Sequence, residues 1–97
     1  MATYVVLGKW TEKTLASMQD AAKATEEIKK FVQSRGAEIK GWYMLMGQYD
    51  EICILEAPDS ETIARIIIPL SAQFGIKTET MQAFGEAEAM KIITSLG

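Results

Sequence analysis

The chain has 97 residues, of which 48% are hydrophobic and 24% are charged, and its formal net charge is −3. This composition is typical of one soluble globular domain and not of a disordered chain. Because there is no histidine and only one cysteine, the sequence excludes His-based catalytic pairs, His-ligated zinc or haem, a cysteine-rich metal site and an internal disulfide. We therefore expect no metal and no cofactor, so any catalysis would rest on carboxylates, Lys, Tyr, Cys53 or a borrowed cofactor.

The ten Lys and Arg residues are scattered, and only Lys29 and Lys30 are adjacent. Without a basic patch to hold a phosphate backbone, we expect no nucleic-acid partner. No apolar stretch approaches the roughly 20 residues of a membrane span, so we expect no membrane association. The N-terminus lacks the basic region and apolar core of a signal peptide. Cys53 lies in an apolar run, where a thiol usually behaves as a small buried hydrophobe, and the chain is expected in a reducing, cytoplasmic setting.

The first half of the chain predicts a strand, a helix and a second strand. Residues 3–9 are rich in β-branched and aromatic types and indicate a strand, and residues 10–17 indicate a loop. Residues 18–36 repeat apolar or small positions at i, i+3, i+4 and i+7, which predicts an amphipathic helix that ends at a glycine. Residues 37–46 indicate the second strand, where Gly41 predicts a bulge or a close backbone approach.

The middle of the chain carries the clearest signals for where strands and helices begin and end. A turn at residues 47–50 leads into an apolar third strand at 51–57. The next residue is a proline, which ends the strand, and Asp59 or Ser60 then caps a second helix. Gly75 closes this helix.

The remaining elements complete the predicted topology. Pro69 predicts a kink or a restart inside the second helix. Residues 76–84 alternate like an edge strand, and residues 86–96 predict a short helix within a C-terminal tail, 85–97. With right-handed crossovers, this order gives a ferredoxin-like βαββαβ sandwich of the α+β class. Its antiparallel four-stranded sheet has the first and third strands at its centre, and the whole chain, 1–97, is expected to form one domain.

The predicted strands are apolar on both faces, which is unexpected for a sheet with one face in water. In the third strand, Ile52 and Ile54 share one face, while Cys53 and Leu55 share the other. An uncovered face of this kind would exceed the few hundred Å² of apolar patch that monomers tolerate. We therefore predict a second subunit packed sheet to sheet in a dimeric α/β-barrel-like assembly, or a larger homo-oligomer. The alternative cover is the tail helix, folded back on its own sheet or exchanged between subunits.

Three separated segments carry a resemblance to a known family. The Gly-Gln-Tyr-Asp hairpin at 47–50, the apolar strand after it and the Glu-Ala-Pro-Asp segment at 56–59 resemble the GYD domain family. Residues 4–11 are similar to the first strand of that family, and residues 77–84 are similar to its last strand. The resemblance implies a small βαββαβ domain related in shape to dimeric α/β-barrel proteins, and it implies no particular reaction.

Four side chains are expected to meet at one edge of the sheet. If the first strand is antiparallel to the third, Lys9 and Trp10 lie beside Tyr49 and Asp50. A cation, an indole, a phenol and a carboxylate at the mouth of an apolar pocket are typical of a small-ligand site. The structural alternatives are that Asp50 bonds local backbone amides or pairs with Lys9, and that Tyr49 is an interface aromatic. Gly47 is expected to permit a positive φ in the turn.

Two functions remain open from the sequence. The favoured one is a non-enzymatic small-ligand-binding or assembly protein, which works as a homo-oligomer and binds a small apolar or aromatic molecule or presents a surface. The alternative is a cofactor-independent oxygenase or isomerase of the dimeric α/β-barrel type, in which Asp50 or Tyr49 acts on a small aromatic or apolar substrate and Lys9 holds an anion. The lack of histidine weighs against this alternative. Four further side chains either line the pocket or belong to the ordinary core: Met18, Trp42, Met44 and Met46.

Overall fold

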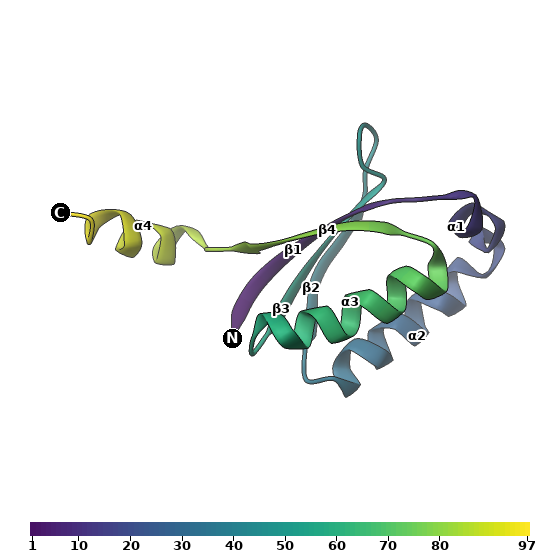
Figure 1. Cartoon of the computed structure of the whole chain (residues 1–97), viewed down its shortest axis with the longest axis horizontal. Helices are drawn as coiled ribbons and strands as arrows, with labels where there is room; N and C mark the ends of the chain where they lie inside the picture. Colours follow the sequence, from purple (N-terminus) through teal and green to yellow (C-terminus); the bar gives the residue numbers. More distant parts are fainter.

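The computed structural model describes residues 1–97 and contains a four-stranded antiparallel sheet with the two longest helices on one face (Figure 1). The strand order is β2-β3-β1-β4, so the first and third strands are central, as predicted. This is the predicted ferredoxin-like α+β fold. The elements in chain order are β1 (Ala2–Lys9), α1 (Glu12–Ala16), the 3-10 helix η1 (Met18–Asp20), α2 (Ala21–Ser34), β2 (Glu38–Met44), β3 (Glu51–Ala57), α3 (Ser60–Phe74), β4 (Lys77–Ala83) and α4 (Glu86–Thr94).

Antiparallel pairing of β1 with both neighbours sets the register of the sheet. The pairing brings Gly8, near the end of β1, opposite Glu51 at the start of β3. A side chain at Gly8 would be strained, because a Cβ there would lie 2.9 Å from the Glu51 side chain. In β2 the register shifts between Ile39 and Gly41, so the pairing is irregular at the glycine where the sequence predicts a bulge or a close backbone approach.

The core lies between the sheet and the inner sides of α2 and α3. The register places Tyr4 opposite Leu55 and Val6 opposite Cys53 on the same face, so alternate residues of β1 and β3 point toward the helices. Eight buried hydrophobic residues form this core: Tyr4, Val6, Val32, Ala37, Leu55, Ala57, Ile63 and Ile66. No helix of the chain combines the length and the apolar character needed to cross a bilayer.

Residues 10–17, predicted as a loop, contain the short helix α1, and this prediction is wrong. Two threonines of this segment donate hydrogen bonds to backbone carbonyls at the end of α3. The Thr11 hydroxyl donates to the Gly75 carbonyl at 2.6 Å, and the Thr14 hydroxyl donates to the Phe74 carbonyl at 2.8 Å. The last carbonyls of a helix have no donor within the helix, so these hydroxyls satisfy groups that would otherwise need water.

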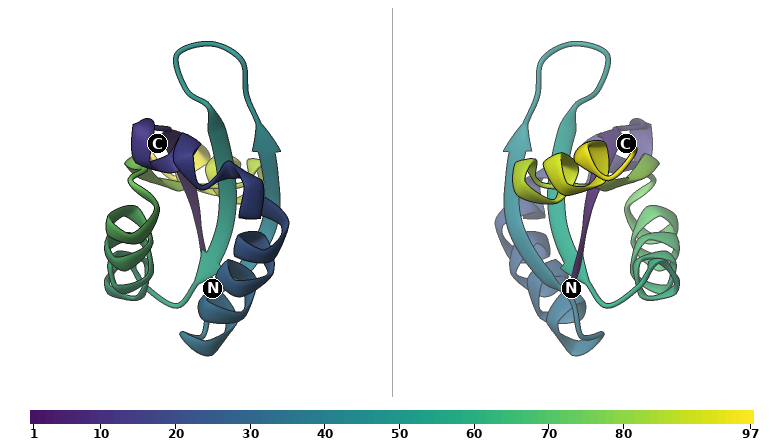
Figure 2. Two further views of the ribbon diagram at one scale, coloured as in Figure 1. Left: turned by 90° about the vertical axis from the view of Figure 1, so that its right-hand side faces the viewer. Right: turned by 90° about the vertical axis from the view of Figure 1, so that its left-hand side faces the viewer.

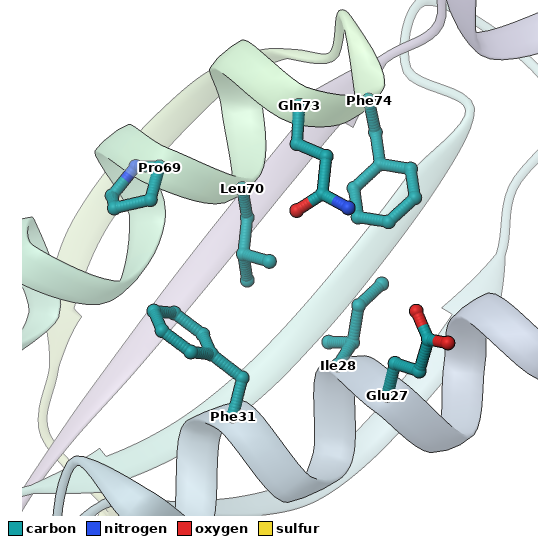
Figure 3. Close-up of a pocket in the computed structure, with 7 residues that line it drawn as sticks. All are labelled: Glu27, Ile28, Phe31, Pro69, Leu70, Gln73 and Phe74. Atoms are coloured by element: carbon teal, nitrogen blue, oxygen red, sulfur yellow. The ribbon is translucent and has the colours of Figure 1, made fainter.

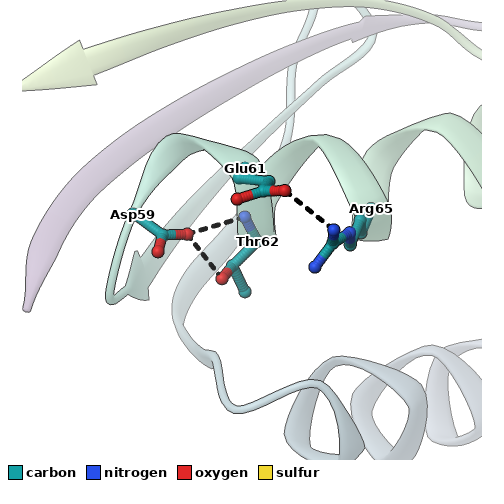
Figure 4. Close-up of polar contacts among 4 residues, drawn as sticks. All are labelled: Asp59, Glu61, Thr62 and Arg65. Atoms are coloured by element: carbon teal, nitrogen blue, oxygen red, sulfur yellow. Dashed lines mark hydrogen bonds and ion pairs between the residues drawn. The ribbon is translucent and has the colours of Figure 1, made fainter.

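The start of α3 agrees with the sequence (Figure 4). The Asp59 carboxylate accepts from the Thr62 amide at 2.8 Å and from the Thr62 hydroxyl at 2.7 Å, and these bonds hold the pKa of Asp59 below its ordinary value. Although Pro69 lies inside α3, the helix continues without a restart to Phe74. Pro69 and Arg65 are both exposed, so the backbone hydrogen bond that the proline cannot donate lies on the solvent side of the helix.

Candidate functional site

The chain between β2 and β3 forms a loop that extends well beyond the sheet (Figures 1 and 2). β2 ends at Met44, two residues before the end of the predicted strand, so residues 45–50 form the hairpin loop. Gly47 in this loop has a φ of 139°, a conformation that side chains disfavour. The Met46 side chain is 98% exposed, so the loop presents an apolar group to solvent.

Asp50 fixes the base of the hairpin loop through three backbone segments. One carboxylate oxygen accepts from the Trp10 amide at 2.8 Å. The Asp50 amide donates to the Gly8 carbonyl at 2.8 Å, and the Asp50 carbonyl accepts from the Leu45 amide at 2.7 Å. These bonds tie both sides of the loop to the end of β1, so the aspartate has the backbone role that turn aspartates usually have.

Lys9 and Tyr49 contact each other beside this base. The Lys9 ammonium lies 5.4 Å from the centre of the Tyr49 ring, within the range of a cation–π interaction. No ion pair joins Lys9 to Asp50, so the pairing considered from the sequence does not form. The Tyr49 hydroxyl instead donates to the Glu79 carboxylate, and this hydrogen bond, with the charge of Glu79, raises the pKa of Tyr49.

The structure therefore brings together Lys9, Trp10, Tyr49 and Asp50, and it adds Glu79 from β4, which the sequence interpretation missed. The signal for Glu79 is the register that places it opposite Leu7, and this register is a long-range property. The ligand-binding role of the four residues stays a prediction.

A hollow of about 220 Å³ lies elsewhere, between α2 and α3 (Figure 3). Its lining is mostly apolar, and none of the four predicted site residues belongs to it. The residues that line it are Glu27, Ile28, Phe31, Pro69, Leu70, Gln73 and Phe74.

The face of the sheet turned away from α2 and α3 carries apolar side chains from all four strands. The register aligns Val5 with Ile54 and Met81, and aligns Leu7 with Ile52. These side chains form what we call the open face, together with Tyr43, which pairs with Ile52: Val5, Leu7, Tyr43, Ile52, Ile54 and Met81. Tyr43 is 60% exposed and Met81 is 43% exposed. The predicted sharing of one face by Ile52 and Ile54 is confirmed.

Three of the side chains considered as core or pocket lining are in fact exposed. Met44 and Met46 lie at or beyond the end of β2, and Trp42 lies on the edge strand, where its ring nitrogen donates to Glu51 at 3.1 Å. Cys53 is half-buried beside the core, and burial, assisted by the charge of Glu51, raises the pKa of its thiol to about 11. Such a thiol stays protonated near neutral pH, which fits the buried hydrophobe that the sequence predicts.

A model of the GYD domain family matches residues 4–93. A protein of Thermus thermophilus, named glutamine synthetase and cystathionine beta-lyase binding protein, is 26% identical over 89 residues, which cover 91% of this chain and 94% of that protein. The crystal structure of FFRP-DM1 matches with a TM-score of 0.59 and 21% identity, covering 87% of this chain and 100% of that one. This structural likeness supports the fold alone.

Proposed function

The chain belongs to the GYD domain family, and from this premise we propose that it is a non-enzymatic binding protein that works as a homodimer or a larger homo-oligomer. The observation that carries the proposal is the open face. Its apolar side chains belong to all four strands and lie away from both long helices. Monomeric proteins rarely leave so continuous an apolar area in water. A second copy packed sheet to sheet around a two-fold axis would cover both open faces at once.

We further propose that the homodimer binds another protein through its hairpin loops. Sheet-to-sheet packing would use the open face and leave residues 45–50 accessible, with Met46 at the surface. Exposed methionines are frequent on surfaces that bind partner proteins, because the side chain adapts to the opposing surface. In this proposal Asp50 and the Trp10 amide hold the loop, and Lys9 and Tyr49 contribute contacts beside it.

The name of the Thermus relative suggests enzymes as the class of partner. We propose the glutamine synthetase and the cystathionine beta-lyase of the organism that produces this chain as the first partners to test.

The state of the side chains favours this proposal over an oxygenase or isomerase. That alternative needs Asp50 or Tyr49 as the base or donor. Asp50 is engaged with the Trp10 amide, and the Tyr49 hydroxyl donates to Glu79 with a raised pKa. Both groups thus have partners within the chain, as structural groups do.

Calorimetric titration of each purified enzyme with the purified chain tests the partner proposal. We expect saturable binding to at least one enzyme, and we expect Met46→Ser to weaken it by about tenfold or more, as for an apolar contact residue. Gln33→Ser, an exposed change on α2, is the matched control and should bind as the wild type does. Absence of binding to both enzymes would refute this choice of partner, and equal binding by both variants would refute the role of the hairpin loop.

A further inference from the structure

The C-terminal helix α4 stands apart from the rest of the molecule. It continues from the end of β4 and projects away from the sheet and from α2 and α3 (Figures 1 and 2). This projection contributes to the elongated shape of the chain, whose extents are 52 × 31 × 18 Å. The alternative in which the tail folds back and covers its own sheet is therefore not what the structure shows.

The connection to α4 explains why the helix does not turn back. Only Phe84 and Gly85 separate β4 from α4, and Gly85 is extended, with φ −63° and ψ 165°. Neither residue lies in a turn or a bend, so no reversal interrupts the chain between β4 and α4. Two extended residues span only about 7 Å. Such a connection carries α4 onward from the strand end and leaves it unable to reach back over its own open face.

One side of α4 is apolar, and it is exposed. At 3.6 residues per turn, most apolar side chains of this segment gather on one side, which begins with Glu86 in the first turn, and Glu88, Lys91 and Ser95 lie on the opposite side. Met90 is 50% exposed, Ile93 is 55% exposed and Leu96 is 80% exposed. The apolar side of α4 consists of Ala89, Met90, Ile92 and Ile93, and Leu96 follows just after the helix.

A helix of this length needs a surface to pack against. α4 has nine residues, whereas isolated helices shorter than about 12–15 residues are marginal in water. Most of the stability of a short amphipathic helix comes from packing of its apolar side. Its own chain provides no such surface, so the packing partner must be another molecule.

We propose that α4 is an exchanged arm: in the homodimer, the two sheets meet over the central strands, and α4 of each copy packs its apolar side against the margin of the other copy's open face, on the edge strands β2 and β4. This inference rests on the proposed homodimer. A second copy is the favoured occupant because the open face continues along the same chain into the arm, from Met81 and Ala83 through Phe84. Two-fold symmetry then lets each copy give one arm and receive one. Apolar side chains meet apolar side chains in both contacts.

Photo-cross-linking in mixed dimers tests the exchange directly. A photoreactive amino acid replaces Ile93, and these chains are equilibrated with isotope-labelled wild-type chains before illumination. We expect cross-links from position 93 to labelled peptides that contain Tyr43 or Met81. Cross-links confined to a single chain, or to peptides of α2 and α3, would overturn the proposal.

A pair of full-length variants adds a quantitative test. Ile93→Glu places a charge on the apolar side of α4, and Thr94→Glu places the same charge one residue on, away from that side. We expect Ile93→Glu to raise the dimer dissociation constant at least about tenfold, and Thr94→Glu to leave it nearly unchanged. Circular dichroism checks that both variants fold.

The outcomes separate the two proposals. If the wild-type chain is monomeric, the homodimer and the arm exchange both fail. If the wild type is dimeric and both variants dimerise equally well, the exchange is wrong and the sheet-to-sheet homodimer survives.

Discussion

The two faces of the sheet are built from similar apolar residues but lie in different surroundings. On the covered face, Leu55 is 2% exposed and packs under helices that include the fully buried Ile66. On the open face, Tyr43 is 60% exposed and Met81 is 43% exposed. The other four open-face residues are partly exposed, and none of the six belongs to the buried core. The proposed homodimer would explain their apolar character, with one side of the sheet used for folding and the other for assembly.

The largest expected effect is on the free energy of unfolding, which should fall much more for a substitution on the core side of α3 than for one on its solvent side. Ile66→Ala removes a side chain that is 0% exposed, and we expect it to lower the free energy of unfolding by about 2–5 kcal/mol. Ile68→Ala is the same change on α3 at a residue that is 69% exposed, and it should cost less than about 0.5 kcal/mol. Urea denaturation measures both. Similar losses for the two variants would contradict the assignment of the core.

The next effect concerns the open face. Ile54→Asp buries a charge in the proposed sheet-to-sheet interface, so we expect the dimer to weaken by about 2 kcal/mol or more. Thr80→Asp is the control, because Thr80 pairs with Val6 on the opposite face and is exposed. Sedimentation equilibrium measures both dissociation constants. A dimer that tolerates Ile54→Asp as well as Thr80→Asp would remove the open face from the interface.

A smaller effect is expected at the hairpin base, which belongs to neither face. Asp50→Ala removes the carboxylate that accepts from the Trp10 amide, and we expect a loss of about 1 kcal/mol in the free energy of unfolding. Hydrogen exchange should show faster exchange at the Trp10 amide with little change in the core. The exposed neighbour Gln48 provides the control as Gln48→Ala. Unchanged protection at Trp10 would show that the carboxylate does not hold this loop.

The smallest effect is a dependence of stability on pH at the start of α3. The folded state lowers the pKa of Asp59, so the stabilisation by its charge is complete above the ordinary value of 3.8 and is lost as pH falls through the lower folded value. Asp59→Asn keeps a capping side chain that does not titrate. We expect the variant to lose less stability than the wild type during acidification, as followed by thermal melts. Parallel acid profiles would contradict the assignment of this cap.

Much of the fold could be predicted, because its main elements carry local signals. Alternation, helical spacing and the capping aspartate are properties of neighbouring residues, and they place both long helices and all four strands. Two errors arose where the decisive contact is distant in sequence. α1 is too short to show a period, and it is held by hydrogen bonds from Thr11 and Thr14 to the end of α3. Leu45 and Met46 look like strand residues, but β2 ends at Met44, and the Leu45 amide bonds to the Asp50 carbonyl at the base of the hairpin loop.

For the candidate site, the grouping of the four residues was predictable, whereas their individual contacts were not. Antiparallel pairing of the first and third strands suffices to bring Lys9 and Trp10 beside Tyr49 and Asp50. The partners of each side chain were not predictable, because Lys9 lies over an aromatic ring and Tyr49 bonds to Glu79 of β4. Those choices depend on the register of an edge strand.

Sedimentation velocity of the full-length wild-type chain at micromolar concentration tests the central claim most directly. If a second copy covers the open face, the main species should have twice the 10.7 kDa mass of the chain, or a higher even multiple, and it should dissociate on dilution. A single species of 10.7 kDa across the whole concentration range would contradict the account.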